Sequence, residues 1–334
     1  MNEVNLINYM DKIYIAGHKG MVGSAIKKKF IENNYKNILT TTRKELDLMD
    51  QNSVLKWFSK NKPNVVILAA AKVGGINANN KFPVNFLLEN MKIQNNVIEA
   101  AWKNGARRFL FLGSSCIYPK LTEQPIKEDS LNCGELEITN EWYATAKISG
   151  IKLCEAFKKQ FEFDSICLMP SNLYGPGDSY HSTNSHVVPS LIKRFYNAKL
   201  SNTKEVVCWG SGKPRREFLH VDDLAEAVLF ALKYWNPNSH DAPLSKKGFP
   251  LLHLNVGTGI DISIKDLANK IAKIVGFEGK ITWDMEQPDG TPQKLLDVSK
   301  LSKMGWSSKI DLEKGLINTF ESFKEELSSG SLRT

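Results

Sequence analysis

Short apolar runs and longer amphipathic stretches alternate along the first half of the chain. Consecutive apolar residues predict buried strands, and apolar positions three and four residues apart predict helices. The expected strands are residues 12–16, 37–40, 64–70, 107–112 and 164–169. The expected helices are residues 21–33, 53–60, 85–104 and 140–161. This alternation is typical of a parallel sheet covered by helices on both faces, so we predict an α/β, doubly wound (Rossmann) fold.

The pattern becomes less regular after Pro170. Glycine and proline predict a loop over residues 172–184, and clustered charges predict a basic turn over residues 213–217. The other expected elements are helices 187–199, 221–234, 263–275 and 312–325, strands 205–208 and 252–255, and loops 235–248 and 287–294. We therefore expect a larger domain of residues 1–171 and 217–257. A smaller, discontinuous α/β domain would contain residues 172–216 and 258–334.

The net charge of the chain and its distribution limit the classes of molecule that we expect it to bind. The 334 residues include 44 Lys and Arg against 36 Asp and Glu, a formal net charge of +8. The excess is spread along the chain, and its longest basic run is residues 27–29. Solvated faces and an anionic small-molecule ligand account for this distribution better than a nucleic acid does.

Five cysteines occur without any C-x-x-C pair: Cys116, Cys133, Cys154, Cys167 and Cys208. The first residues lack the apolar core of a signal peptide, and no uncharged apolar run approaches the ~20 residues of a membrane span. We therefore expect reduced thiols in the cytoplasm and no membrane partner. No cluster of His, Cys and acidic residues has metal-ligand spacing, so no metal site is expected.

A glycine-rich segment follows the first expected strand and opens the first expected helix. Its Gly17, Gly20 and Gly23 form a Gly-x-x-Gly-x-x-Gly pattern that includes Lys19, Met21 and Val22. Such glycines allow a tight turn and the close approach of a pyrophosphate to the positive end of a helix. We interpret the segment as a dinucleotide-binding loop rather than a plain glycine turn.

The end of the second strand discriminates between the two nicotinamide dinucleotides. An NAD site usually has an acidic residue there, which binds the ribose 2′-hydroxyl. Here the segment contains three threonines and then Arg43. Arg43, together with Lys19, would suit a 2′-phosphate, so the sequence favours NADP(H). The alternative is that Arg43 is only an exposed loop cation.

Tyr143 and Lys147 are four residues apart, so they share one face of an expected helix. A nearby ammonium lowers the pKa of a phenol, which would suit Tyr143 to exchange a proton with a carbonyl oxygen during hydride transfer. Ser114 follows an apolar strand, where α/β sheets hold ligands, and could hydrogen-bond the same oxygen.

Several stretches together carry a family resemblance. They are residues 15–24 (IAGHKGMVGS), 69–76 (AAAKVGGI), 112–120 (LGSSCIYPK), 172–176 (NLYGP), 209–212 (WGSG), 216–223 (REFLHVDD) and 288–292 (PDGTP). With them the chain resembles the extended short-chain dehydrogenase/reductases. It is most similar to the members that epimerise C3 and C5 of GDP-4-keto-6-deoxymannose and then reduce C4 with NADPH.

The resemblance implies roles for individual residues. Tyr143 would donate a proton, Lys147 would tune it, and Ser114 would hold the substrate oxygen. Cys116 and His186 would form the acid/base pair of the epimerisation, with their individual roles left open. Taken alone, Cys116 would be interpreted as a small buried residue and His186 as an ordinary hydrogen-bonding histidine.

The resemblance also implies binding residues. Further cofactor contacts would come from Leu112, Gly113, Ser114, Ser115, Lys147, Pro170, Ser171, Asn172, Leu173 and His186. Substrate contacts would come from Arg194, Trp209, Arg216, Asp289 and Lys294. For the arginines the alternative is a surface salt bridge, and for Trp209 it is core packing. Helices 85–104 and 140–161 would form a homodimer interface.

Two other functions compete with this one. The first is an epimerase/reductase of another GDP-4-keto sugar, such as a GDP-6-deoxy-heptose. Trp142, where the family often has proline, is the position at which we expect such a difference. The second is a catalytically inactive NADP sensor, which the intact Ser114, Tyr143 and Lys147 argue against.

Overall fold

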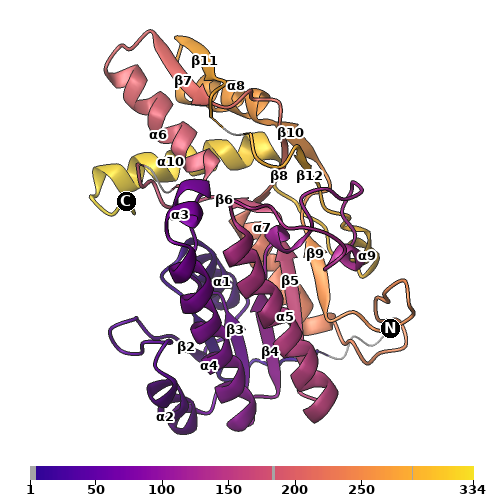
Figure 1. Cartoon of the computed structure of the whole chain (residues 1–334). Coiled ribbons are helices and arrows are strands. Elements are labelled where there is room, and N and C mark those ends of the chain that lie inside the picture. The colour runs from indigo at the N-terminus through magenta and orange to yellow at the C-terminus, as the bar shows by residue number, and fades with distance from the viewer. Residues whose placement is uncertain (1–4, 183–184, 288) are drawn as a thin grey trace.

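The computed structural model describes residues 5–182, 185–287 and 289–334, arranged as two lobes (Figure 1). The larger lobe is built on a six-stranded, wholly parallel sheet with the order β2-β1-β3-β4-β5-β9. Its strands are β1 (Ile13–Ala16), β2 (Ile38–Leu39), β3 (Val65–Leu68), β4 (Arg108–Leu112), β5 (Ser165–Pro170) and β9 (His253–Val256). The predicted α/β, doubly wound fold is confirmed.

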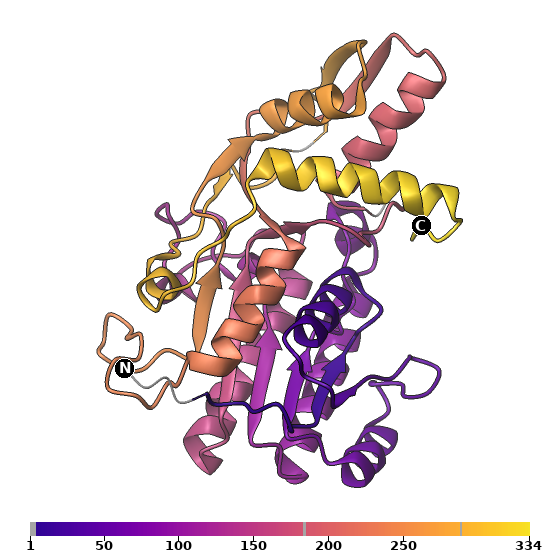
Figure 2. The same ribbon diagram turned by 180° about the vertical axis from the view of Figure 1, so that it is seen from behind.

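Helices cover both faces of this sheet. One face is covered by α1 (Met21–Glu32) and α7 (Val221–Tyr234). Figure 2 turns the molecule so that these two helices lie in front. The opposite face is covered by α2 (Gln51–Asn61), α4 (Asn90–Lys103) and α5 (Glu141–Phe161). The residues of β1 alternate between the two cores: Ile13 and Ile15 face α1 and α7, and Tyr14 and Ala16 face the other layer. Burial on both faces explains why the strands are continuously apolar.

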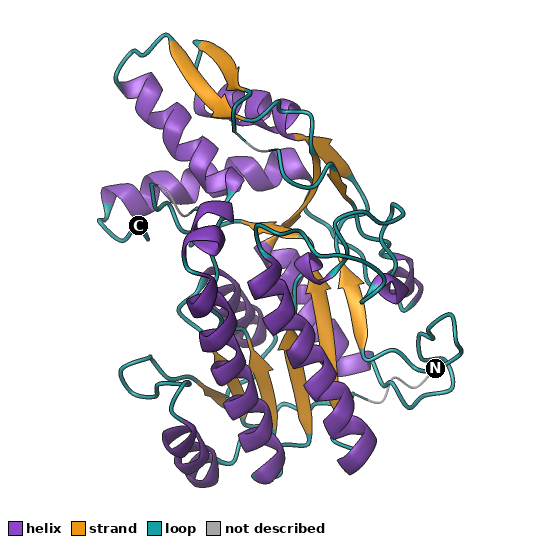
Figure 3. Ribbon diagram, in the orientation of Figure 1, coloured by secondary structure: helices purple, strands orange, loops and turns teal. Residues whose placement is uncertain are grey.

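The smaller lobe has its own core beneath α6 (Val187–Leu200), α8 (Ile264–Val275) and α10 (Leu312–Ser328). One sheet has the order β10-β8-β12, and β6 also pairs with β8. These strands are β6 (Asn172–Tyr174), β8 (Arg215–His220), β10 (Asp261–Ser263) and β12 (Gln293–Lys294). The parallel pair β7 (Glu205–Trp209) and β11 (Lys280–Asp284) forms the outer edge (Figure 3).

Several local predictions were wrong. The predicted loop 172–184 begins with β6, the predicted basic turn 213–217 overlaps β8, and the predicted loop 287–294 ends in β12. Positions 183, 184 and Pro288 lie outside the described residues. Short helices α3 (Ile76–Lys81) and α9 (Ser299–Lys303) were not predicted, and a π-helical turn, Asn85–Glu89, precedes α4.

The predicted domain boundary between residues 216 and 217 falls inside β8. The division into two discontinuous domains stays a prediction. None of the helices in the described ranges is long and apolar enough to cross a bilayer.

Candidate active site

The glycine-rich segment joins β1 to α1 at the point where the strand order reverses, with β2 on one side of β1 and β3 on the other. Gly17 has φ +90°, and a Cβ there would lie 2.6 Å from the backbone nitrogen of Ala70. A Cβ on Gly23 would lie 2.2 Å from the carbonyl oxygen of Gly17. Only glycine fits at either position. The segment therefore forms a side-chain-free cradle at the carboxyl end of the sheet, where such folds bind dinucleotides.

The cradle also has the polarity that a pyrophosphate requires. Gly20 is the N-cap of α1, and no side chain in the described part of the chain caps this end. The first turn contains no acidic residue. The free N–H groups of the helix and its positive end are thus available to an anion.

A loop from the smaller lobe lies over the cradle. A Cβ on Gly177 would be 3.9 Å from Cα of Met21. The Gly177 N–H donates to Oε1 of Glu326 at 3.0 Å, and Arg333 donates to the Gly177 carbonyl oxygen at 2.8 Å. The C-terminal helix and the segment after it therefore hold this loop against the start of α1.

Exposed cations lie near the same end of the sheet. Lys19 and Arg43 are both exposed, and the carboxylate of Glu45 accepts the Thr42 N–H at 2.7 Å. This acidic side chain is thus engaged within its own loop.

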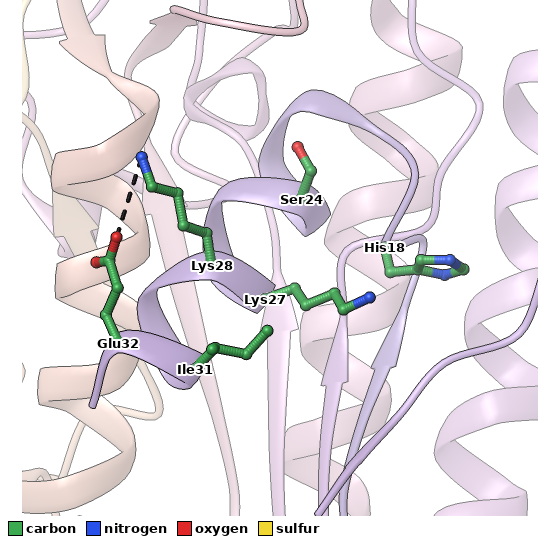
Figure 4. Close-up of a pocket in the computed structure, with 6 residues that line it drawn as sticks. All are labelled: His18, Ser24, Lys27, Lys28, Ile31 and Glu32. Carbon is green, nitrogen blue, oxygen red and sulfur yellow. Dashed lines mark ion pairs between the residues drawn. The ribbon is translucent and has the colours of Figure 1, made fainter. Parts of the chain in front are cut away.

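A pocket of about 370 Å³ lies beside the glycine-rich segment, on the outer side of α1 (Figure 4). It is lined by His18, Ser24, Lys27, Lys28, Ile31 and Glu32. Lys27 extends toward His18, and Lys28 pairs with Glu32 at 4.0 Å. Burial lowers the pKa of His18, and the neighbouring lysines add to this effect. The pocket therefore has a basic rim but lies apart from Tyr143.

The carboxyl end of β4 holds the second part of the site. The ammonium of Lys147 donates to the Leu112 carbonyl oxygen at 2.8 Å. Gly113 lies against β5, because a Cβ there would be 2.4 Å from the sulfur of Met169. A single 3-10 turn, Ser115–Ile117, follows. The hydroxyl of Ser114 accepts the Cys116 N–H at 3.3 Å, which holds the Ser114 side chain against the backbone of this turn.

Tyr143 and Lys147 lie on one face of α5, as predicted. The Lys147 ammonium is 5.7 Å from the centre of the Tyr143 ring. Lys147 is buried, and burial lowers the pKa of its ammonium to about 8. Burial raises the pKa of the Tyr143 phenol, a nearby Cys116 adds to the rise, and a side-chain hydrogen bond with Ser114 opposes it.

The predicted lowering of the Tyr143 pKa was therefore wrong for this structure. The Lys147 ammonium is engaged by the Leu112 carbonyl oxygen, and desolvation of the phenol outweighs any attraction from it. Tyr143 is consequently a protonated phenol at neutral pH, and it can donate its proton.

Cys116 lies between the Ser114–Tyr143 pair and the smaller lobe. The side-chain amide of Asn140 donates to the Cys116 sulfur at 3.6 Å. Arg216 of β8 is close enough to interact electrostatically with Cys116. Burial lowers the pKa of the Arg216 guanidinium. The interactions with Cys116, Glu137 and Asp289 act in the opposite direction. The thiol, the phenol and a guanidinium thus meet where the two lobes face each other.

His186 is the N-cap residue of α6 in the smaller lobe. Its side chain is exposed, yet the surrounding protein lowers the pKa of the imidazole by desolvation. The ring is therefore neutral at pH 7 and can accept a proton.

Two of the predicted substrate residues lie near Arg216. Lys294 of β12 is its register partner. Asp289 accepts hydrogen bonds from the backbone N–H and the hydroxyl of Ser211, both at 2.7 Å. Both Asp289 oxygens are thus used to fix the turn after β7.

The other two predicted substrate residues, Arg194 and Trp209, lie farther from Arg216 in the smaller lobe. Arg194 donates to the Val207 carbonyl oxygen, and Trp209 is 55% exposed at the end of β7. The exposure of Trp209 excludes the alternative of core packing. Arg194 is not in a surface salt bridge among the described residues.

The predicted cofactor residues after β5 also lie at the carboxyl end of the sheet. Pro170 ends β5, and Asn172 donates to the Glu217 carbonyl oxygen at 2.9 Å. Leu173 packs on the core beneath α1 and α7. The buried hydroxyl of Ser171 has no hydrogen-bond partner among the described residues. An unpartnered buried hydroxyl at this position fits a site that a polar ligand completes.

Sequence reasoning missed three polar residues around the site. Glu137 is buried and pairs with Lys120 at 2.9 Å. Asn140 contacts Cys116, and Glu217 accepts backbone N–H groups from Gly259 and Leu296 at 2.8 and 2.9 Å. A signal for Asn140 was its position at the start of the predicted helix 140–161, three residues before Tyr143. Among residues 5–182, 185–287 and 289–334, no group of His, Cys and acidic side chains could hold a metal ion.

Comparison with known proteins places this geometry in a family. The model of the NAD dependent epimerase/dehydratase family matches residues 13–242. A GDP-L-fucose synthase of Escherichia coli is 49% identical over 94% of this chain and 97% of its own length. GDP-L-fucose synthase 1 of Arabidopsis thaliana is 51% identical over 93% of this chain and 92% of its own.

A solved structure agrees with this assignment. A GDP-mannoheptose C4 reductase from Campylobacter jejuni with NADP bound superimposes with a TM-score of 0.84. It is 36% identical, over 95% of this chain and 99% of that one. The chain belongs to the NAD dependent epimerase/dehydratase family.

Proposed function

We propose that the protein is a GDP-L-fucose synthase. It epimerises C3 and C5 of GDP-4-keto-6-deoxy-D-mannose and reduces C4 with NADPH. The observation that carries the proposal is the position of the Cys116 thiol beside Ser114 and Tyr143 at the end of β4. A reductase needs only the phenol and the hydroxyl, whereas an epimerase also needs a group that exchanges carbon-bound protons.

NADP(H) is the cofactor of the proposed reaction, and the residues present fit it. The glycine cradle and the free end of α1 would hold the pyrophosphate, and Lys19 and Arg43 the 2′-phosphate. Further contacts would come from Met21, Val22, Leu112, Gly113, Ser115, Lys147, Pro170, Ser171, Asn172, Leu173 and His186. When bound, NADPH supplies the hydride that C4 accepts.

The chain's own residues manage the protons of the reduction. Ser114 and Tyr143 hydrogen-bond the C4 carbonyl oxygen, and Tyr143 donates its proton to that oxygen when C4 is reduced. Lys147 then stabilises the phenolate electrostatically. Lys147 is buried, and its bond to the Leu112 carbonyl oxygen holds the ammonium near the Tyr143 ring.

Epimerisation uses the same oxygen site. The protons at C3 and C5 lie next to the C4 carbonyl, so removal of either one gives an enolate whose oxygen Ser114 and Tyr143 stabilise. Cys116 and His186 act as the acid/base pair, one removing a proton and the other returning one to the opposite face. Both residues lie on segments at the junction of the two lobes.

The GDP moiety would extend into the smaller lobe. Arg216 is a cation that interacts with Cys116, and Lys294 is its register partner on the neighbouring strand. Arg194 and Trp209 lie farther along the same lobe. Asp289 shapes the turn after Trp209 through its bonds to Ser211. We further propose a cytoplasmic homodimer that associates through α4 and α5, which cover the face of the sheet opposite α1 and α7.

The experiment is NMR analysis of the product formed from GDP-4-keto-6-deoxy-D-mannose and NADPH. GDP-L-fucose is expected. The alternative, an enzyme for a GDP-6-deoxy-heptose, rests on the likeness to the 36% identical heptose reductase. It would be favoured if the hexose were left unreduced and the corresponding 4-keto-heptose were turned over.

A further inference from the structure

The side chain of Asn140 makes a contact that the proposed reaction does not yet explain. Its Nδ2 donates to the Cys116 sulfur at 3.6 Å. Its Oδ1 is buried and has no hydrogen-bond partner among the described residues. A buried amide oxygen without a partner is uncommon, because the desolvation cost is not offset. The contact with the Cys116 sulfur is therefore the side-chain hydrogen bond of this amide among the described residues.

Backbone geometry places Asn140 where it can act on the whole site. Its N–H donates to the Glu137 carbonyl oxygen at 3.0 Å, and its own carbonyl oxygen accepts from Ala144 at 3.0 Å as α5 begins. The residue thus lies at the N-terminal end of the helix that carries Tyr143. Its contact with Cys116 connects that helix to the strand end of β4.

The other groups that face the sulfur have different effects. Tyr143 of α5 is neutral, and Arg216 of β8 is a cation that favours the thiolate. Glu137 and Asp289 are carboxylates that interact with Arg216 and offset part of its field. The Asn140 amide is the neutral donor in contact with the sulfur itself.

We propose that Asn140 is a positioning residue that orients the Cys116 sulfur by donating an amide hydrogen to it. The proposal rests on the proposed function, because it assigns Asn140 to the epimerisation that Cys116 performs. The donated hydrogen bond strengthens when the sulfur carries a negative charge. The contact therefore favours the thiolate, which is the form that removes a proton from carbon.

The test is the pH profile of Cys116 alkylation by iodoacetamide, read by peptide mass spectrometry. All variants carry Cys133→Ser, because Cys133 is the other cysteine with solvent exposure among the described thiols. In Asn140→Ala we expect slower alkylation in the neutral range and a profile displaced to higher pH, because the hydrogen bond to the sulfur is lost. Asn140→Asp keeps the shape but adds a negative charge, so a shift at least as large is expected.

Asn33→Ala is the matched control. The Asn33 amide bonds the Lys29 carbonyl oxygen at the far end of α1, so its loss should leave the profile unchanged. An unchanged profile in Asn140→Ala, or a shift to lower pH, would overturn the proposal. A shift to lower pH would mean that the thiol donates to the amide instead.

A second measurement separates this proposal from the proposed function. Solvent deuterium incorporation into the substrate should fall about tenfold in Asn140→Ala, while the Kd for NADPH stays that of the parent. If Cys116→Ala still incorporated deuterium at the parent rate, the role of Cys116 in the proposed reaction would fail, yet the alkylation profile would still report on Asn140. If only the alkylation profile failed to shift, the proposed function would stand without Asn140.

Discussion

Replacing Asp178 with Asn should remove a pH-dependent loss of folding stability that originates in the loop over the glycine cradle. Asp178 is 4% exposed, and burial raises the pKa of its carboxyl to about 7. The Ser179 N–H, at 2.7 Å, and Arg333 favour the charged form, whereas Glu326 opposes it. The favourable interactions with the Ser179 N–H and with Arg333 only partly offset the desolvation of the Asp178 carboxylate, so its pKa stays raised.

The magnitude follows from linkage between protonation and folding. In the unfolded chain the carboxyl ionises near its ordinary pKa of 3.8, and in the fold it ionises near 7. Between these values the folded state binds more protons, so the free energy of unfolding falls as pH rises and levels off above pH 7. The full difference is about 4 kcal/mol, at 1.36 kcal/mol per pH unit. About 3 kcal/mol of it is lost between pH 5 and pH 8.

The assay is urea unfolding of the parent and of Asp178→Asn at pH 5, 6, 7 and 8. Because groups that do not interact with Asp178 titrate alike in both proteins, the difference between the two free energies reports on Asp178 together with its interaction with Glu326. We expect that difference to change by about 3 kcal/mol in favour of Asn over this range. A difference that stays constant across the four pH values would refute the reasoning, whatever the absolute stability of the variant.

Three further predictions concern the proposed reaction. Cys116→Ala should abolish solvent deuterium incorporation at C3 and C5, followed by NMR; incorporation at the parent rate would remove Cys116 from the mechanism. Tyr143→Phe should slow NADPH oxidation about 10²- to 10⁴-fold, because the acid is lost. Near-normal turnover, compared with a Tyr9→Phe control on the exposed surface, would contradict this role. Arg43→Ala should weaken NADPH binding about tenfold or more and leave NADH binding almost unchanged; calorimetry showing equal losses would dismiss the 2′-phosphate contact.

The elements that the sequence predicts correctly are those whose signal is local. The strands of the main sheet are runs of apolar residues, and the glycine segment combines three glycines between a strand and a helix. Tyr143 and Lys147 are four residues apart on one helix. In each case the physical cause lies within a few residues of the feature.

The features that the sequence did not predict depend on partners far along the chain. The charged sequence at the start of β8 is typical of a turn. In the structure, however, Arg215 pairs with Asp261 at 2.7 Å, and the Glu217 carboxylate accepts a hydrogen bond from the Leu296 N–H. Asn140 meets Cys116 across 24 residues of chain. The pKa of Tyr143 depends on desolvation by the whole site. None of these can be read from local pattern.

The pairing of β6 with β8 has a mechanical consequence. Two separate passes of the chain cross between the lobes as adjacent, hydrogen-bonded strands, with Leu173 in register with Leu219. The Asn172 side chain adds a bond to the Glu217 carbonyl oxygen. A simple hinge at a single loop would break this ladder. The Glu217 carboxylate of β8 also accepts the backbone N–H groups of Gly259 and Leu296, so several stretches of chain near the junction of the lobes are joined by hydrogen bonds. A change in the relative orientation of the lobes must therefore twist these stretches together.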